Sequence, residues 1–121
     1  MLNALCVGAG GFIGAVLRYL IGLIPVKEGF IFPVKTLIIN VAGCFLIALI
    51  TGIALKNSNL SPKMQLFLKT GICGGFTTFS TFALESVNLY NSGHIGLSIL
   101  YVALSVILGI SGVILGFIVT K

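Results

Sequence analysis

Four long apolar runs, separated by short polar turns, constrain this chain more than any other feature of its sequence. The runs cover about residues 3–24, 33–55, 62–90 and 95–119. About 20 apolar residues in a helix cross the hydrocarbon core of a bilayer, so each run is long enough. With 58% hydrophobic and 7% charged residues, a chain of 121 residues could not bury its apolar surface in water. We therefore predict an all-α integral membrane protein, with one four-helix transmembrane domain over residues 1–121 and an up-and-down order of helices.

The charged and reactive residues exclude several other classes of protein. The seven cations lie singly near the ends of the apolar runs, which indicates contact with anionic lipid headgroups. A nucleic-acid partner would need a basic cluster, so none is expected. Because the sequence shows no nucleophile paired with a base, no metal triad and no phosphate loop, we do not expect an enzyme. The cysteines match no zinc or redox spacing and are typical of small buried residues: Cys6, Cys44 and Cys73.

The placement of the cations bears on orientation in the membrane. One membrane face carries Lys56, Lys63, Lys69 and Lys121, and the other carries Lys27 and Lys35, with Arg18 near it. Four cations against three give a weak bias under the positive-inside rule. Such a bias is compatible with insertion in both orientations, and hence with an antiparallel homodimer. It is equally compatible with a modest preference for one orientation.

The first run combines close-packing residues with a charge. Gly10 and Gly14 have the spacing that lets two helix backbones touch. One turn later comes Arg18, about 22 Å along the helix from Asn3. Two roles remain open for Arg18. It either anchors the helix end by extending to the interface, or draws anions into a vestibule, because a charge within the membrane is costly and usually functional.

Asn40 is a strongly polar residue at the middle of the second run. An amide without a partner in hydrocarbon costs roughly 4–8 kcal/mol, so Asn40 must face protein or water. Its side chain can donate two hydrogen bonds. It either bridges two helices or donates to an anion in a pore.

The third run predicts a helix that breaks at mid-membrane. As one helix, residues 62–90 would measure more than about 40 Å, which is longer than the hydrocarbon core needs. At its centre, Gly74-Gly75 is followed by Thr77-Thr78, and glycine and threonine are both poor helix formers. A break frees backbone carbonyls, which at membrane depth need protein, water or an ion as a partner. Carbonyl oxygens suit an alkali cation.

Two phenylalanines follow the predicted break. Phe79 and Phe82 lie one helical turn apart, and hydroxyl side chains surround them: Thr78, Ser80 and Thr81. Because the edge of an aromatic ring is electropositive, two ring edges and several hydroxyl donors form a site for a small, hard anion. The alternative is that both rings are ordinary hydrophobic core.

The fourth run carries a stripe of small and polar residues at steps of three and four. The stripe consists of Ser98, Tyr101, Ser105, Gly109, Gly112 and Gly116. Its first half offers hydroxyl donors, and Gly112 and Gly116 in its second half favour close helix packing. A polar track beside the phenylalanines and a plain packing seam are both compatible with the stripe. Glu85, one turn beyond Phe82, either marks a proton or cation route or is a neutral, hydrogen-bonded carboxyl.

A longer pattern joins these features. It reads Gly10-Gly11-x-x-Gly14-Ala15-x-x-Arg18-Tyr19, then Asn40, then Gly71-x-x-Gly74-Gly75-Phe76-Thr77-Thr78-Phe79-Ser80-Thr81-Phe82. Over essentially its whole length, the chain resembles the CrcB/Fluc fluoride channels. The resemblance implies a fluoride-specific channel of the bacterial plasma membrane, which passively exports cytoplasmic fluoride and lowers its toxicity. It also implies an antiparallel, dual-topology homodimer with two pores.

The resemblance assigns roles to particular residues. It implies one structural sodium ion at the dimer centre, held by backbone carbonyls of Gly74 and Thr77. It places Asn40, Phe79 and Phe82 along the pore, with Tyr101 and Ser105 as a polar track. We add Thr78 and Ser80 to the predicted pore as the hydroxyl donors around the phenylalanines. The chain departs from the family at Gly109, where a further serine is often found, and water is a possible substitute for that hydroxyl.

Two other classes of protein remain as alternatives. A small dual-topology multidrug exporter driven by protons has a similar length and four helices, but it normally needs a carboxylate in its first helix. Here the first run has none. A non-transporting assembly subunit is the other alternative, and it predicts no flux from pure protein in liposomes.

Overall fold

The computed structural model describes residues 1–57 and 59–121, and every regular element in those residues is a helix. The elements are α1 (Leu2–Gly22), α2 (Val34–Lys56), α3 (Pro62–Gln65), the π-helix η1 (Leu66–Cys73), α4 (Gly74–Phe76), α5 (Phe79–Asn91) and α6 (Ile95–Val119). Three of them, α1, α2 and α6, are each long and apolar enough to cross a membrane without interruption. The fourth predicted span is the bent path from α3 to α5. The predicted all-helical membrane fold, with four helices of which the third is broken, is therefore confirmed.

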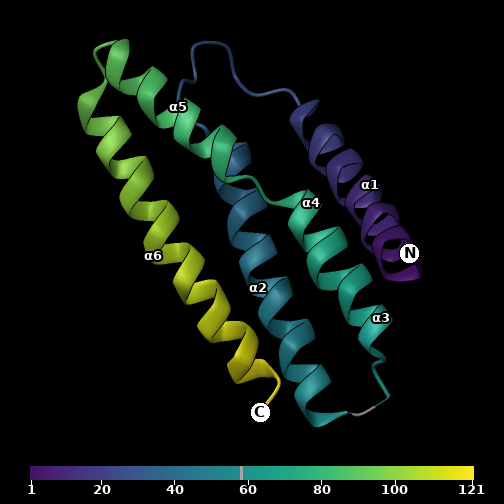
Figure 1. Cartoon of the computed structure of the whole chain (residues 1–121). Coiled ribbons are helices and arrows are strands. Elements are labelled where there is room, and N and C mark those ends of the chain that lie inside the picture. Colours follow the sequence, from purple (N-terminus) through teal and green to yellow (C-terminus); the bar gives the residue numbers. More distant parts are fainter. Residues whose placement is uncertain (58) are drawn as a thin grey trace.

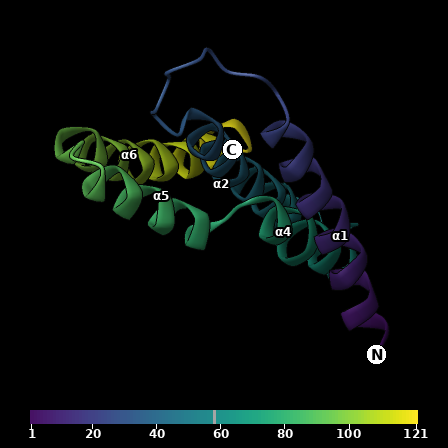
Figure 2. The ribbon, with the colours of Figure 1, turned by 90° about the horizontal axis from the view of Figure 1, so that it is seen from above.

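The helices alternate in direction, as the short turns predicted. In Figure 1, α1 and the path from α3 to α5 rise, whereas α2 and α6 descend. α6 packs along α2, α5 packs on α6, and α1 packs on η1 and α4. α1 contacts α2 only marginally. The view from above in Figure 2 accordingly shows an open arrangement, with α5 and α6 at one end and α1 at the other.

The fold buries few side chains, and many large apolar side chains remain exposed on the single chain. The hydrophobic core is a small cluster of Leu37, Leu89 and Tyr101, which joins α2, α5 and α6. In water, apolar exposure of this extent would be unstable, whereas lipid tails or a second protein surface cover it at no cost.

The break in the third span lies at Thr77 and Thr78. Both residues are extended, with φ and ψ of −81° and 158° at Thr77 and −150° and 118° at Thr78. Thr78 then caps α5, because its hydroxyl accepts a hydrogen bond from the amide of Thr81 at 3.2 Å. The break falls where the paired glycines and threonines predicted it. Figure 1 shows it as the thin connection between α4 and α5.

Glycines set the closest helix contacts. A methyl group at Gly10 would lie 2.9 Å from the Cα of Gly71, and one at Gly14 would lie 2.7 Å from the amide nitrogen of Phe76. At the other end of the molecule, a methyl group at Gly116 would lie 2.7 Å from the Cβ of Ala48. Gly112 is buried against the same helix, α2. The second half of the α6 stripe is therefore a packing seam.

Replacing Gly14 by alanine should destabilise the protein by about 1–3 kcal/mol, because the added methyl group meets the backbone of α4. The matched control is Gly8→Ala, since a Cβ at Gly8 meets nothing within 4 Å and alanine favours a helix. Thermal unfolding in detergent measures both variants. Equal melting temperatures for the two variants would contradict this packing role of Gly14.

Candidate functional site

The site begins with Asn40, which pairs with the backbone at the break. Asn40 Oδ1 accepts a hydrogen bond from the amide of Thr78 at 2.8 Å, and Asn40 Nδ2 donates to the carbonyl of Thr78 at 3.0 Å. Asn40 thus satisfies both main-chain groups of one extended residue, as a neighbouring strand would. Of the two roles left open for Asn40, bridging two helices is the one the structure shows. Its second N–H is still available for another acceptor.

Arg18 reaches the same break from α1. Its Nε donates a hydrogen bond of 3.3 Å to the carbonyl of Gly75, a residue 57 positions away in the chain. The side chain therefore points to the break, and it also forms part of a cavity wall. This contact does not agree with the first of the two roles left open for Arg18, an anchor that extends to the membrane interface.

Three carbonyls at the break accept no hydrogen bond from any residue that the structure describes: those of Gly74, Phe76 and Thr77. In a continuous helix, the amide of Thr78 would donate a hydrogen bond to the carbonyl of Gly74, but here that amide donates to Asn40 Oδ1. The described residues contain no group of three or more His, Cys, Asp or Glu that could hold a metal. The open carbonyls of Gly74 and Thr77 are chemically suited to sodium.

Two main-chain donors are also left open, at the start of α5. In the described chain, the amides of Phe79 and Ser80 have no hydrogen-bond partner, while the next amide, of Thr81, is capped by Thr78. They lie at the positive end of the α5 dipole, where an anion is stabilised. The sequence interpretation missed them as donors. The signal was Thr78 itself, a hydroxyl residue that typically caps a helix start.

Most of the predicted pore residues line one cavity of about 380 Å³ between α2, the break, α5 and α6. Those residues are Asn40, Thr78, Phe79, Phe82 and Ser105. The two phenylalanine rings lie 5.6 Å apart between centroids. Phe79 is 79% exposed on the single chain, so its ring faces outward and is available to a second surface. Ser105 Oγ is buried and has no partner among the described residues, which leaves its hydroxyl free to donate.

The other predicted hydroxyls lie outside this cavity. Tyr101 is fully buried behind Phe82, with 5.2 Å between ring centroids, and it supports that ring instead of lining the cavity. Ser98 donates to the carbonyl of Ser86 at 2.7 Å, so its hydrogen is already used. Ser80 is exposed, and its hydroxyl lies 3.4 Å from that of Thr78. The α6 stripe therefore brings one free hydroxyl, Ser105, to the cavity of the phenylalanines.

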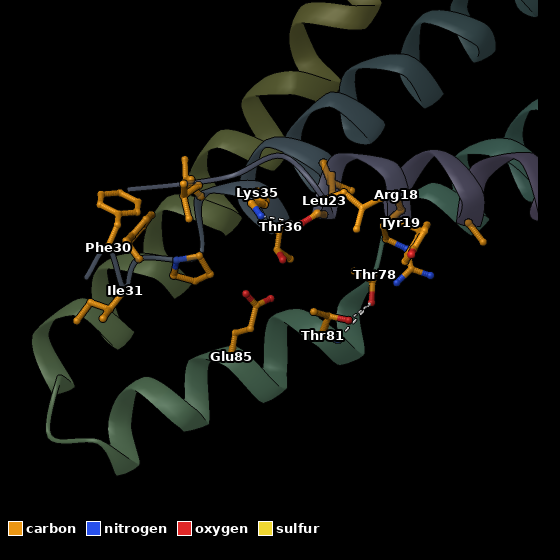
Figure 3. A pocket seen from close by; sticks show the side chains of 17 residues that line it. Arg18, Tyr19, Leu23, Phe30, Ile31, Lys35, Thr36, Thr78, Thr81 and Glu85 are labelled. Atoms are coloured by element: carbon orange, nitrogen blue, oxygen red, sulfur yellow. Dashed lines mark hydrogen bonds between the residues drawn. The ribbon is translucent and has the colours of Figure 1, made fainter. Parts of the chain in front are cut away.

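A second cavity, of about 630 Å³, lies between the end of α1, the start of α2 and α5. Figure 3 shows Glu85 pointing into it across from Thr36, with Arg18 near Thr78. Glu85 Oε1 is buried without a hydrogen-bond partner in the described chain. Because Thr78 lines both cavities, the break separates them. The sequence interpretation left Glu85 open, and it offered a vestibule at Arg18 as one of two roles without assigning Glu85 to it.

The helices and the two cavities define a multi-pass membrane protein with an interrupted helix at a polar path. The family model described as "CrcB-like protein, Camphor Resistance (CrcB)" matches residues 5–117, and the chain belongs to this family. It is 44% identical to the "Fluoride-specific ion channel FluC" of Azobacteroides pseudotrichonymphae genomovar. CFP2, over 95% of this chain and 93% of the relative. Proteins of the same name from Ruminiclostridium cellulolyticum and Chlorobaculum tepidum are each 45% identical, over 100% of this chain and 94% and 96% of their own lengths.

Replacing Asn40 by leucine should destabilise the fold by about 2–5 kcal/mol, because both main-chain groups of Thr78 lose their partner at membrane depth. The control is Thr51→Val on the same helix. The Thr51 hydroxyl bonds only to the carbonyl of Ile47, one turn earlier, so its loss should change little. Thermal unfolding of the two variants in detergent measures the difference. A Leu variant as stable as the control would contradict the bridging role of Asn40.

Proposed function

We propose that this chain is a fluoride-specific ion channel that passively exports cytoplasmic fluoride. One observation carries the proposal: the break places open amide donors, a side-chain amide and two phenylalanine rings together, beside one cavity. The relatives named as fluoride-specific channels match nearly the full length of the chain, which supports the same assignment.

The chemistry of the site suits a small anion that binds water strongly. A pore for fluoride has to replace the hydrogen bonds of its hydration shell. The second N–H of Asn40, the hydroxyl of Ser105, the N–H groups of Phe79 and Ser80 and the ring edges of the phenylalanines supply such donors. None of these donors carries a formal charge, so fluoride is bound weakly enough to leave again.

The larger cavity suits the entrance to this path. Lys35 brings positive charge to its wall, and Thr78 forms its boundary with the cavity of the phenylalanines. Fluoride enters a cell as neutral HF and dissociates in the cytoplasm. The membrane potential then drives the anion outward by about 2.3 kcal/mol per charge for each 100 mV, without any fuel.

The single chain leaves the path open on one side, which is why we include an antiparallel, dual-topology homodimer in the proposal. Phe79 is 79% exposed beside the cavity, and Gly74 is exposed as well. A second copy in the opposite orientation would cover both residues and complete a pore on each side of the interface. The weak bias of cations between the two membrane faces, four against three, is compatible with insertion in both orientations.

A structural sodium ion is part of the same proposal. The carbonyls of Gly74 and Thr77 would hold it together with the same groups of a second copy, since a single chain offers few oxygens. When bound, sodium supplies a positive charge that compensates the carbonyl dipoles at the break.

The alternative function, a proton-driven multidrug exporter, is not favoured. Such an exporter normally needs a carboxylate in its first helix, and α1 contains none.

Replacing Phe82 by isoleucine should slow fluoride efflux from liposomes about tenfold or more, because the ring edge is lost while apolar bulk is kept. Phe12→Ile is the matched control, since Phe12 is 71% exposed on α1, away from the cavity. A fluoride electrode reads the efflux, and chloride efflux gives the baseline. Wild-type fluoride rates in the Phe82 variant would reject the ring-edge role.

Purification with N-methylglucamine in place of sodium should lower the melting temperature of the protein. The break would then keep open carbonyls at membrane depth. Returning sodium should restore the melting temperature in a concentration-dependent way, whereas potassium at the same ionic strength should restore less. An identical melting temperature in all three solutions would contradict a bound sodium ion.

A further inference from the structure

Arg18 lies on the face of α1 that packs against the third span. Gly10, Gly14 and Arg18 follow one another at intervals of four residues, so they lie along one side of the helix. The two glycines bring the α1 backbone onto η1 and α4. One turn further along, the same face meets the end of α4. The arginine is therefore directed at the break by the register of the glycines.

The acceptor of Arg18 is a carbonyl that the break exposes. In a continuous helix, the carbonyl of Gly75 would accept a hydrogen bond from the amide of Phe79, four residues later. That bond is absent, because Phe79 begins α5 after two extended residues, and Arg18 Nε donates to Gly75 instead. A free carbonyl at this depth would be costly, and the amide of Phe79 is a donor close to it in the chain. A hydrogen bond between the amide of Phe79 and the carbonyl of Gly75 would continue α4 through the break.

We propose that Arg18 is a positioning residue for ion permeation, and that it acts through Gly75. The Nε–H of Arg18 donates a hydrogen bond to the carbonyl of Gly75. This bond keeps α4 from continuing through the break and leaves the amide of Phe79 open to the cavity. Asn40 holds the next part of the break, at Thr78, from α2. The positive charge of Arg18 is secondary to this hydrogen bond. The inference rests on the proposed fluoride channel for its flux measurement.

Three substitutions separate the hydrogen bond from the charge. In Arg18→Gln, the amide nitrogen occupies the same place along the side chain as Nε of arginine, so the donor is kept and the charge is lost. In Arg18→Lys, the charge is kept, but a methylene occupies the place of Nε. Arg18→Met keeps an unbranched side chain as far as the ε position and removes both the donor and the charge. Glutamine and lysine are both polar, so their comparison decides even where the methionine variant does not fold.

Fluoride efflux from liposomes should rank wild type and Arg18→Gln together, within about threefold, with Arg18→Met at least about tenfold slower and Arg18→Lys in between. The effect of ionic strength on efflux should be the same in wild type and the glutamine variant, because a charge that steers anions would be screened by salt. Wild-type efflux in Arg18→Lys together with slow efflux in Arg18→Gln would overturn the inference in favour of a charge that attracts anions.

A second measurement does not depend on flux. Hydrogen exchange of the Phe79 amide, followed by NMR in lipid nanodiscs, should be slower in Arg18→Met than in wild type, because that amide then bonds to Gly75. Arg18→Gln should exchange at the wild-type rate. Unchanged exchange in the methionine variant would overturn the positioning role. A wild-type chain that passes no fluoride would instead refute the proposed function, and this exchange measurement would still decide what Arg18 does at the break.

Discussion

At membrane depth, a main-chain N–H or C=O group without a partner costs several kcal/mol, and this cost governs the centre of the molecule. The third span interrupts its helix at Thr77 and Thr78, so its main chain needs partners from elsewhere. Asn40 supplies both partners of Thr78, and Arg18 supplies that of Gly75. Among the main-chain groups of the break, the carbonyls of Gly74, Phe76 and Thr77 and the amides of Phe79 and Ser80 still have no partner in the described chain. They are the polar groups that an ion can use.

The rest of the fold holds the break in place. α2 and α6 form a close pair through glycines of α6, and this pair carries Asn40 and Ser105. α1 and the first part of the third span form another close pair, which carries Arg18. The break lies where these two pairs meet. Each pair thus contributes one side chain to the main chain of the break, and the exposed ring of Phe79 remains on the open face.

The sequence predicts the fold well because its main signals are local. Run length gives the four spans, the sequence Gly74-Gly75-Phe76-Thr77-Thr78 gives the break, and the spacing of Gly10 and Gly14 gives a packing face. Because a polar group without a hydrogen-bond partner in hydrocarbon costs several kcal/mol, the mid-membrane position of Asn40 also predicts that it contacts protein or water.

The partners of individual side chains could not be predicted in the same way. Whether Arg18 reaches lipid headgroups or Gly75 depends on the distance between α1 and α4, which tertiary packing decides. Ser98 looks like part of a polar track by its spacing, but its hydroxyl bonds to a carbonyl of α5. The π-helix from Leu66 to Cys73 has no counterpart in the pattern of apolar residues.

The attachment of α1 has a mechanical consequence. α1 packs on η1 and α4 but touches α2 only marginally, and its opposite face is covered with exposed apolar side chains. Lateral pressure from the surrounding lipid on this helix is therefore transmitted chiefly to the segment that ends at the break. A change in bilayer thickness or stiffness would act first on the orientation of the Gly75 carbonyl, and the lipid would then tune conduction without binding in the path.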